Sequence, residues 1–183
     1  MENEPIDEAR AENLEVVAVT RVQSEFQASL GRVIAALLAC RRYQRVTVAD
    51  LWALVVEPLA RGRIYLGMPH AEEDQLRWPG GLTGVVIWAS LSGEAEDRLR
   101  LQIEDGVHPV SLPSNDWAGG EMLWLLDVVA PNEELAAETL AAFCGDLKGA
   151  PMFAHPNVSL AVQPSVLASL EIVEAKAGHE RLH

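Results

Sequence analysis

The sequence predicts a single α/β domain, a mixed β-sheet flanked by helices. Its 183 residues fit one domain with a substantial core. Apolar residues recur at helical spacing in some segments, whereas residues 83–91 and 122–129 form apolar runs typical of buried strands. The hydrophobic share is 49% and the charged share 22%, which excludes a disordered chain or a collagen-like fibre.

Two helices are predicted before the first strand. Residues 24–39 have apolar side chains at helical spacing, and Ser24 followed by Gln27 is a weak capping signal. Before them we expect a flexible acidic tail at residues 1–20, so that the domain spans 21–183. The second helix is expected at residues 47–59, where Thr47 and Asp50 resemble a cap.

Strands are predicted at residues 64–68, 83–91 and 122–129, the last being MLWLLDVV. The segment 92–105 fits either a helix or an edge strand, and the pattern does not separate them. A Pro-Gly-rich stretch, residues 69–82, is expected to be a loop.

After the third strand, Asn132 is expected to cap a helix over residues 133–147. A short strand is expected near residues 158–162, and the pattern of residues 165–183 predicts no single structure. The element order is that of one mixed α/β sheet.

Net charge restricts the partners. The sum is −13, from 27 acidic and 14 basic residues. Such a surface repels nucleic acid and anionic membranes, so we expect neither as a general partner. No apolar run reaches the roughly 18 residues of a membrane span, and the acidic N-terminus lacks the features of a secretory signal. The expected compartment is therefore the cytoplasm.

A basic island lies within this acidic chain. Residues 30–70 contain six arginines against Asp50 and Glu57. The island is either a solvated helix end or a docking patch for an acidic protein or a phosphate-bearing ligand. Its centre is Arg41, Arg42, Arg45, Arg61 and Arg63.

Asp127 is the main candidate functional residue, because a carboxylate within an apolar strand loses several kcal/mol of hydration unless it is paired. Strict alternation would place Leu123, Leu125, Asp127 and Val129 on one face. Asp127 is either satisfied by a buried arginine or backbone amides, or orients a catalytic partner.

Other candidate residues are less distinctive. Trp88 and Ser90 are candidate substrate-binding residues, with a core tryptophan and an ordinary strand serine as the alternatives. All five histidines fit loops or the tail, and no two have metal-ligand spacing, so we expect no metal site. They are His70, His108, His155, His179 and His183.

Two sequence blocks, read together, resemble a known family. Trp88, Ala89, Leu91, Ser92 and Glu94 match a W-A-x-L-S-x-E strand. A second block, D-W-x-S-G-D-x-x-W-x-x-D-x-x-A-P, is matched at Asp116, Trp117, Gly120, Trp124, Asp127, Ala130 and Pro131, and Pro58 matches a proline after the second helix. Over roughly residues 28–147 the chain is similar to the toxin-activating lysine acyltransferases, which mature RTX protoxins.

The resemblance implies a GNAT-like fold and a reaction. A fatty acyl group would pass from acyl–acyl carrier protein to lysine ε-amines of an RTX-type protoxin, with no bound cofactor. The implied partners are acyl carrier protein and the protoxin, and a homodimer stays open. The family's catalytic pair is a histidine, on the turn after the first helix, and the aspartate that corresponds to Asp127.

The histidine does not carry over. The family turn reads S-P-x-H-R, whereas Cys40 to Gln44 read C-R-R-Y-Q, which places Tyr43 at the histidine position and Cys40 at the serine. A free tyrosine has a pKa of about 10 against about 6.5 for histidine, so its deprotonated fraction at pH 7 is roughly a thousandfold smaller. Nearby arginines would favour a Tyr43 phenolate, and Asp127 would oppose it.

Cys40 offers another route. The same arginines would favour its thiolate, which could take the acyl group from a thioester. The alternative is a small residue buried at the end of a helix. Two functions therefore remain: an acyltransferase with a rearranged catalytic group, and a catalytically inactive module that binds acyl carrier protein or another partner. Arg41, Arg42 and Arg45 are the expected carrier-docking surface in both.

Overall fold

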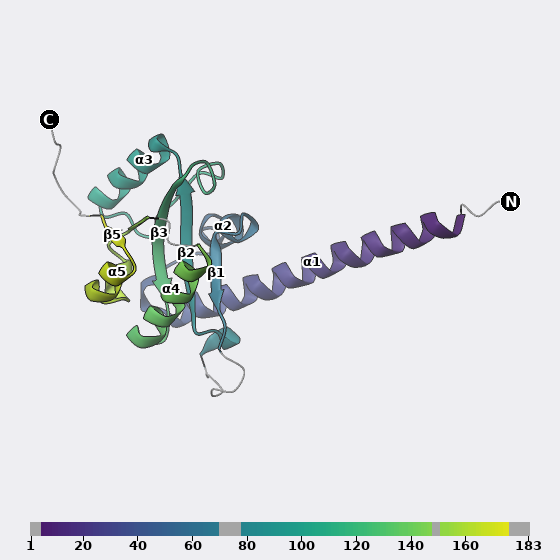
Figure 1. Cartoon of the computed structure of the whole chain (residues 1–183), viewed down its shortest axis with the longest axis horizontal. Coiled ribbons are helices and arrows are strands. Elements are labelled where there is room, and N and C mark those ends of the chain that lie inside the picture. Colours follow the sequence, from purple (N-terminus) through teal and green to yellow (C-terminus); the bar gives the residue numbers. More distant parts are fainter. Residues whose placement is uncertain (1–4, 70–77, 148–150, 176–183) are drawn as a thin grey trace.

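The computed structural model describes residues 5–69, 78–147 and 151–175, with side chains from residue 17 onward. A five-stranded mixed sheet forms its centre, in the order β1-β2-β3-β4-β5 (Figure 1). The first three strands pair antiparallel with one another, whereas the fourth pairs parallel with the third and the fifth parallel with the fourth. The strands are β1 Ile64–Gly67, β2 Gly84–Leu91, β3 Met122–Val129, β4 Met152–Ala154 and β5 Ile172–Glu174. The predicted α/β class is therefore confirmed.

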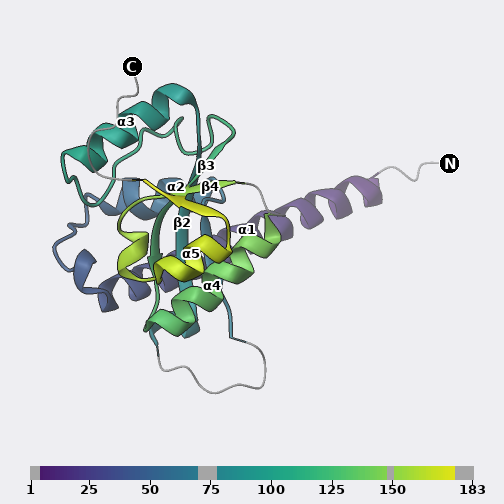
Figure 2. The ribbon, with the colours of Figure 1, turned by 60° about the vertical axis from the view of Figure 1, so that its left-hand side comes forward.

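Helices cover both faces of the sheet. One core layer contains side chains of α1, of the π-helical turn η2 and of α3, and the other contains side chains of α4 and α5. Figure 2 shows α4 and α5 in front of the sheet and α1 behind it. The bounds are α1 Pro5–Ala39, η2 Trp52–Val56, α2 Glu57–Ala60, α3 Gly93–Glu104, α4 Glu133–Asp146 and α5 Pro164–Ser169.

Helix α1 begins well before the expected start at Ser24. Its C-terminal part is packed, with Val33 and Ala36 fully buried, whereas Val17 and Val22 are more than 60% exposed. Its N-terminal part extends away from the sheet (Figure 1). The expected start of the helix at Ser24 was wrong. No glycine or proline interrupts residues 6–23, and Pro5 suits the first position of a helix, so the helix extends back to Pro5. Residues 5–20 are thus helical, although we expected a flexible tail there.

The segment 92–105, left undecided, forms α3. Ser92 is its N-cap and accepts a hydrogen bond from the Ala95 amide at 3.3 Å. Ala95, Leu99 and Ile103, spaced by four residues, are buried against the sheet. The cap and the four-residue spacing settle the choice in favour of a helix.

Two other expectations need correction. The strand expected near residues 158–162 is a short 3-10 turn, η4 (Val158–Leu160), and the strand of this region lies earlier, at β4. The second helix is shorter than residues 47–59. Thr47 and Asp50 do bond at 2.7 Å, but they close a turn, and the helix follows as η2 and α2. Pro58 has no N–H for the Leu54 carbonyl, which interrupts regular α-helical bonding there.

A β-bulge in β3 determines which way Asp127 faces. Ile87 pairs with Asp127, yet Trp88 pairs with Leu125, so Leu126 is the extra residue. Strict alternation was therefore wrong. Asp127 shares the α1 side of the sheet with its partner Ile87, whereas Leu125 belongs to the α4 side.

None of the helices in the described part of the chain combines the length and apolar character needed to cross a membrane.

Candidate active site

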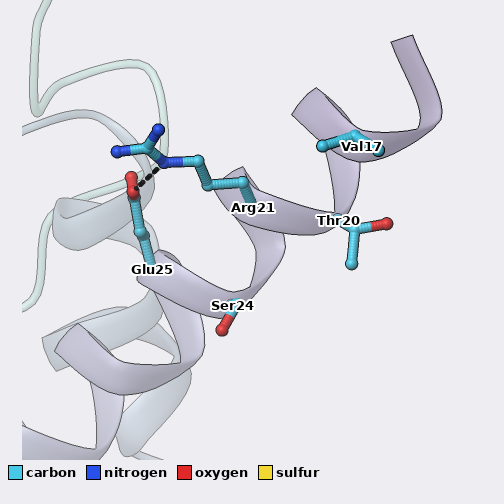
Figure 3. Close-up of a pocket in the computed structure, with 5 residues that line it drawn as sticks. All are labelled: Val17, Thr20, Arg21, Ser24 and Glu25. Carbon is cyan, nitrogen blue, oxygen red and sulfur yellow. Dashed lines mark hydrogen bonds and ion pairs between the residues drawn. The ribbon is translucent and has the colours of Figure 1, made fainter. Parts of the chain in front are cut away.

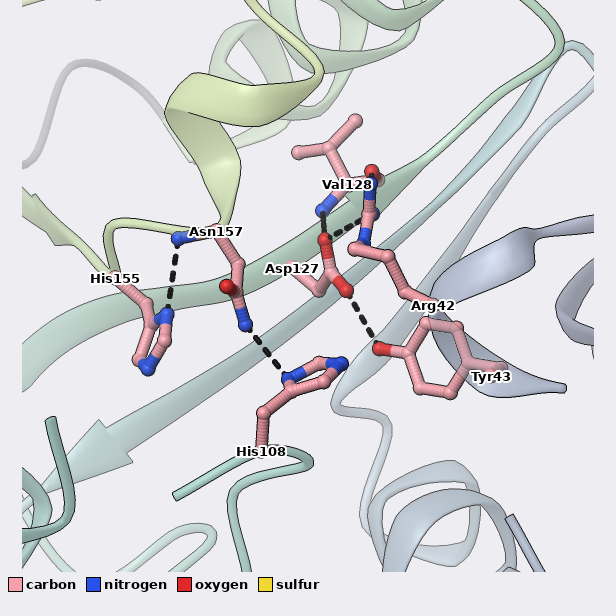
Figure 4. Close-up of polar contacts among 7 residues, drawn as sticks. All are labelled: Arg42, Tyr43, His108, Asp127, Val128, His155 and Asn157. Carbon is pink, nitrogen blue, oxygen red and sulfur yellow. Dashed lines mark hydrogen bonds and ion pairs between the residues drawn. The ribbon is translucent and has the colours of Figure 1, made fainter. Parts of the chain in front are cut away.

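Asp127 is buried near the end of β3, with 2% of its surface exposed. Three donors satisfy its carboxylate (Figure 4). Arg42 Nη2 lies 2.6 Å from Oδ1, the Val128 amide donates to the same oxygen at 2.7 Å, and the Tyr43 hydroxyl donates to Oδ2 at 2.6 Å. Asp127 is thus satisfied by an arginine and a backbone amide, and it also bonds Tyr43. Both sequence-based interpretations of Asp127 are compatible with this arrangement.

The turn after α1 brings Arg42 and Tyr43 to this carboxylate. The helix ends at Ala39 because Cys40 is extended, with φ −93° and ψ 123°, and the 3-10 turn η1 (Arg41–Tyr43) follows. Arg42 also donates to the Val128 carbonyl at 3.0 Å. Arg41 and Arg45 remain exposed, so the three arginines expected to dock a carrier do not share one environment.

Burial sets the protonation of this cluster. It raises the pKa of Asp127 to about 6, although Arg42, the Tyr43 hydroxyl and the Val128 amide oppose the rise. Burial and the facing Asp127 raise the pKa of Tyr43 well above its ordinary value, and Arg42 only partly compensates. Tyr43 is therefore a neutral hydroxyl at pH 7, which argues against a phenolate base.

His108 is the residue that the sequence did not single out. It lies on the loop after α3, exposed to solvent, with its ring centroid 5.5 Å from that of Tyr43 in an edge contact. Its Nδ1 is 2.7 Å from Asn157 Nδ2. Burial of part of the ring and the charge of Arg42 lower its pKa. Tyr43, His108 and Asn157 lie on segments far apart in the sequence, so only the fold could reveal that their side chains meet.

His155 occupies the buried side of the same group. The backbone N–H of Asn157 donates to His155 Nδ1 at 3.0 Å, and His155 Nε2 is buried with no hydrogen-bond partner among the described residues. Burial, and to a smaller extent His108, lower the pKa of His155 to about 4. His155 is therefore neutral at pH 7, and Asn157 connects it to His108 (Figure 4).

Cys40 is half-buried next to η1, and its thiol makes no hydrogen bond to the described residues. It lines a small pocket of about 150 Å³ together with Arg42, Asn132 and Glu133. The structure thus places the Cys40 thiol beside the cluster but outside its hydrogen-bond network.

Trp88 and Ser90 lie on the other side of the sheet. Trp88 packs against Phe143 of α4, with ring centroids 5.6 Å apart, and the Arg63 guanidinium lies 4.2 Å from its ring. The Ser90 hydroxyl is 3.0 Å from Arg63 Nη2. The fold therefore does not bring these two candidate substrate-binding residues to Asp127.

An apolar pocket of about 260 Å³ opens on the α1 side, and Tyr43 is part of its wall. Its rim includes Leu38 and Val48, which are 68% and 86% exposed. The wall consists of Ile34, Leu37, Leu38, Tyr43, Val46, Thr47, Val48 and Leu51. A polar cluster and an apolar pocket thus share Tyr43.

A second hollow lies along the projecting part of α1 (Figure 3). It is lined by Val17, Thr20, Arg21, Ser24 and Glu25, and an exposed ion pair joins Arg21 Nε to Glu25 Oε1 at 2.8 Å. All of its described lining residues belong to one helix, so among them no side chains from separate elements converge on this hollow. Within the described ranges, no group of three or more histidine, cysteine, aspartate or glutamate side chains could hold a metal ion.

The comparison with family models decides the relationship. The model of the RTX toxin acyltransferase family (HlyC) matches residues 22–148, well over half of the chain. The chain belongs to the RTX toxin acyltransferase family. No curated protein matches it. The matched segment contains Tyr43, His108 and Asp127 but ends before His155 and Asn157.

Membership confirms the resemblance drawn from the two sequence blocks. It also gives the reaction class, acyl transfer, and the kind of target, an RTX toxin. In this RTX toxin acyltransferase Asp127 lies at the centre of the polar cluster.

Proposed function

We propose that this protein transfers a fatty acyl group from acyl–acyl carrier protein to lysine ε-amines of an RTX-type protoxin. The observation that carries the proposal is Asp127, a buried carboxylate at the family's position that is hydrogen-bonded to residue 43. The GNAT-like description of the fold belongs to the same proposal.

The reaction requires few groups. The lysine nitrogen attacks the thioester carbonyl, a C–N bond forms and the C–S bond breaks. The amine gives up a proton, and the departing carrier thiolate takes one. A general base suits this work when its pKa lies near the working pH.

The apolar pocket beside Tyr43 supports an aliphatic substrate. Ligand pockets are mostly apolar, with a few polar groups that fix orientation. This pocket has such walls, and Tyr43 joins it to the Asp127 cluster. We place the acyl chain there, with its thioester towards Tyr43.

Carrier docking is assigned to Arg41 and Arg45. Both are exposed and form no ion pair with the described residues, whereas Arg42 is held by Asp127. Acyl carrier proteins are strongly acidic, so exposed arginines on an otherwise acidic protein would orient the encounter.

The docking assignment predicts a salt-dependent defect. Reversing Arg41 and Arg45 to glutamate should weaken carrier binding at low salt, and the difference from wild type should shrink as salt rises. Reversing Arg21 and Arg32, two exposed arginines of α1, makes the same charge change elsewhere and is the matched control. Unchanged affinity in the first variant at low salt would refute the assignment.

A second candidate function is a binding module without transfer. The observation that favours it is Tyr43 at the histidine position, buried and with a raised pKa. In that case carrier protein would bind and no acyl group would leave it.

The two functions separate in one experiment. The protein is incubated with acyl–acyl carrier protein and an RTX protoxin, and the protoxin mass is measured before and after hydroxylamine. Acyl transfer to lysine predicts an added acyl mass that resists hydroxylamine, lost in Asp127→Asn. Carrier binding with an unchanged protoxin mass would support the binding module instead.

A further inference from the structure

The two groups at the family's catalytic positions are bonded to each other, with the Tyr43 hydroxyl donating to Asp127 Oδ2 at 2.6 Å. Tyr43 is 5% exposed and Asp127 is 2% exposed. A lysine amine that attacks a thioester needs a base within hydrogen-bond distance. Tyr43 borders the apolar pocket, but its hydroxyl stays protonated and donates to Asp127, which is itself buried. A neighbouring group must therefore accept the proton of the amine.

His108 is the exposed neighbour of this pair. Its ring meets the Tyr43 ring edge-on while the residue remains open to solvent. Figure 4 shows the imidazole between Asn157 on one side and Tyr43 on the other. It arrives from the loop between α3 and β3, a different segment from the turn where the family has its histidine.

We infer that His108 is the catalytic base: it accepts the proton of the attacking lysine and replaces the imidazole that position 43 lacks. This inference rests on the proposed acyl transfer. Tyr43 and Asp127 are then positioning residues that act through the ring of His108.

The hydrogen bonds of His108 suit this role. Nδ1 is held by the side chain of Asn157, whereas Nε2 has no hydrogen bond to the described residues. As placed, the Asn157 Nδ2 atom faces Nδ1, but the two ends of an amide are interchangeable by a half-turn. Asn157 Oδ1 has no partner among the described residues to hold it back. With Oδ1 accepting from Nδ1–H, the Nε2 lone pair is free for the substrate.

Charged and titratable neighbours keep the imidazole neutral. The groups around it are Arg42 and Tyr43 from η1, Asp127 behind Tyr43 on β3, and His155 with Asn157 after β4. Partial burial and the Arg42 charge lower the pKa of His108, so the ring is unprotonated at pH 7.

The proton that His108 accepts can then pass to the departing carrier thiolate. Nε2 takes it as the C–N bond forms, and the imidazolium donates through Nδ1–H to Asn157 Oδ1. When the C–S bond breaks, Nε2–H protonates the carrier thiolate, and the neutral ring is restored. No other acid or base is needed.

The test compares lysine acylation rates at saturating carrier substrate. His108→Gln should lower kcat by roughly 10²–10⁴-fold with an unchanged melting temperature. Val107→Gln, the exposed preceding residue of the same loop, is the matched control and should keep the wild-type rate. Asn157→Asp should move the acidic limb of the kcat/KM profile to higher pH, because a carboxylate at Nδ1 favours the imidazolium.

The role of His108 and the proposed function can be refuted separately. An active wild type together with an equally active His108→Gln would overturn the role of His108 and leave the proposed function standing. A wild type without transfer would overturn the proposed function and, with it, the role of His108. Diethyl pyrocarbonate gives a reading without turnover: it should modify His108 faster than buried His155, and an unreactive His108 would contradict the inference.

Discussion

Asp116 and Asp127 belong to the same sequence block, and each lies 2.6 Å from an arginine, yet their surroundings differ. The side chain of Asp127 is 3% exposed and that of its partner Arg42 23%. For Asp116 and Arg98 the exposed fractions are 14% and 48%. The same contact distance therefore occurs once inside the fold and once at its surface.

The difference shows that burial, more than distance, sets what an ion pair does. A surface pair is screened and contributes about 0–1 kcal/mol. A buried carboxylate has lost its hydration and needs every donor around it. Asp127 has three, from Arg42, Tyr43 and Val128, and its pKa still rises to about 6. A carboxylate in this state can exchange a proton near neutral pH.

The largest expected effect comes from removing the arginine of each pair. Arg42→Met leaves the Asp127 charge buried without its cation and should lower the free energy of unfolding by about 3–5 kcal/mol. Arg98→Met should cost far less, because solvent and salt screen an exposed pair. Urea denaturation of both variants measures the difference. Equal losses would mean that burial does not distinguish the two pairs.

The pH dependence of stability gives the next effect. The folded pKa of Asp127 lies above its unfolded value of 3.8, so the folded state holds this proton over the interval from 3.8 to about 6. The stabilisation is complete below 3.8 and is lost as pH rises through about 6, by about 3 kcal/mol at ~1.4 kcal/mol per pKa unit.

Asp127→Asn removes this titration and serves as the reference. The free energy of unfolding of wild type, relative to Asp127→Asn at the same pH, should fall between pH 4 and pH 7. Denaturation at four or five pH values tests the sign. A relative stability that increases over the same interval would indicate a lowered pKa.

The two tyrosines give a smaller contrast. Tyr43→Phe removes the hydroxyl that donates to Asp127 and should cost about 1–3 kcal/mol. Tyr65 packs its ring against Phe143 and makes no hydrogen bond through its hydroxyl to the described residues, so Tyr65→Phe should stay within about 0.5 kcal/mol. Thermal unfolding at one pH compares the two variants. Similar losses of stability would mean that the Tyr43–Asp127 hydrogen bond does not stabilise the fold.

The central strands could be predicted because local pattern and tertiary packing agree there. MLWLLDVV is apolar except for Asp127 and forms β3 with the predicted bounds. The segment 92–105 could not be resolved, because its pattern became decisive only once Ser92 was seen to cap a helix on the sheet. The early start of α1 was missed because a weak signal at Ser24 outweighed an uninterrupted run of helix formers.

The site was predictable in part. Asp127 and Tyr43 could be selected from one buried charge and one departure from a family motif. The side of the sheet that Asp127 faces could not be predicted, because one extra residue in the strand, Leu126, interrupts the alternation of side chains. His108 could not be selected from the sequence either, because its contact with Tyr43 depends on the position of a loop 65 residues further along the chain.

The most direct test moves the imidazole between two positions. Lysine acylation of a protoxin is followed for wild type, His108→Gln, and His108→Gln combined with Tyr43→His. The account predicts that wild type is active, that His108→Gln loses roughly 10²–10⁴-fold, and that the double variant recovers part of the loss, since Asp127 can support an imidazole at position 43. Wild-type activity that persists in His108→Gln would contradict it.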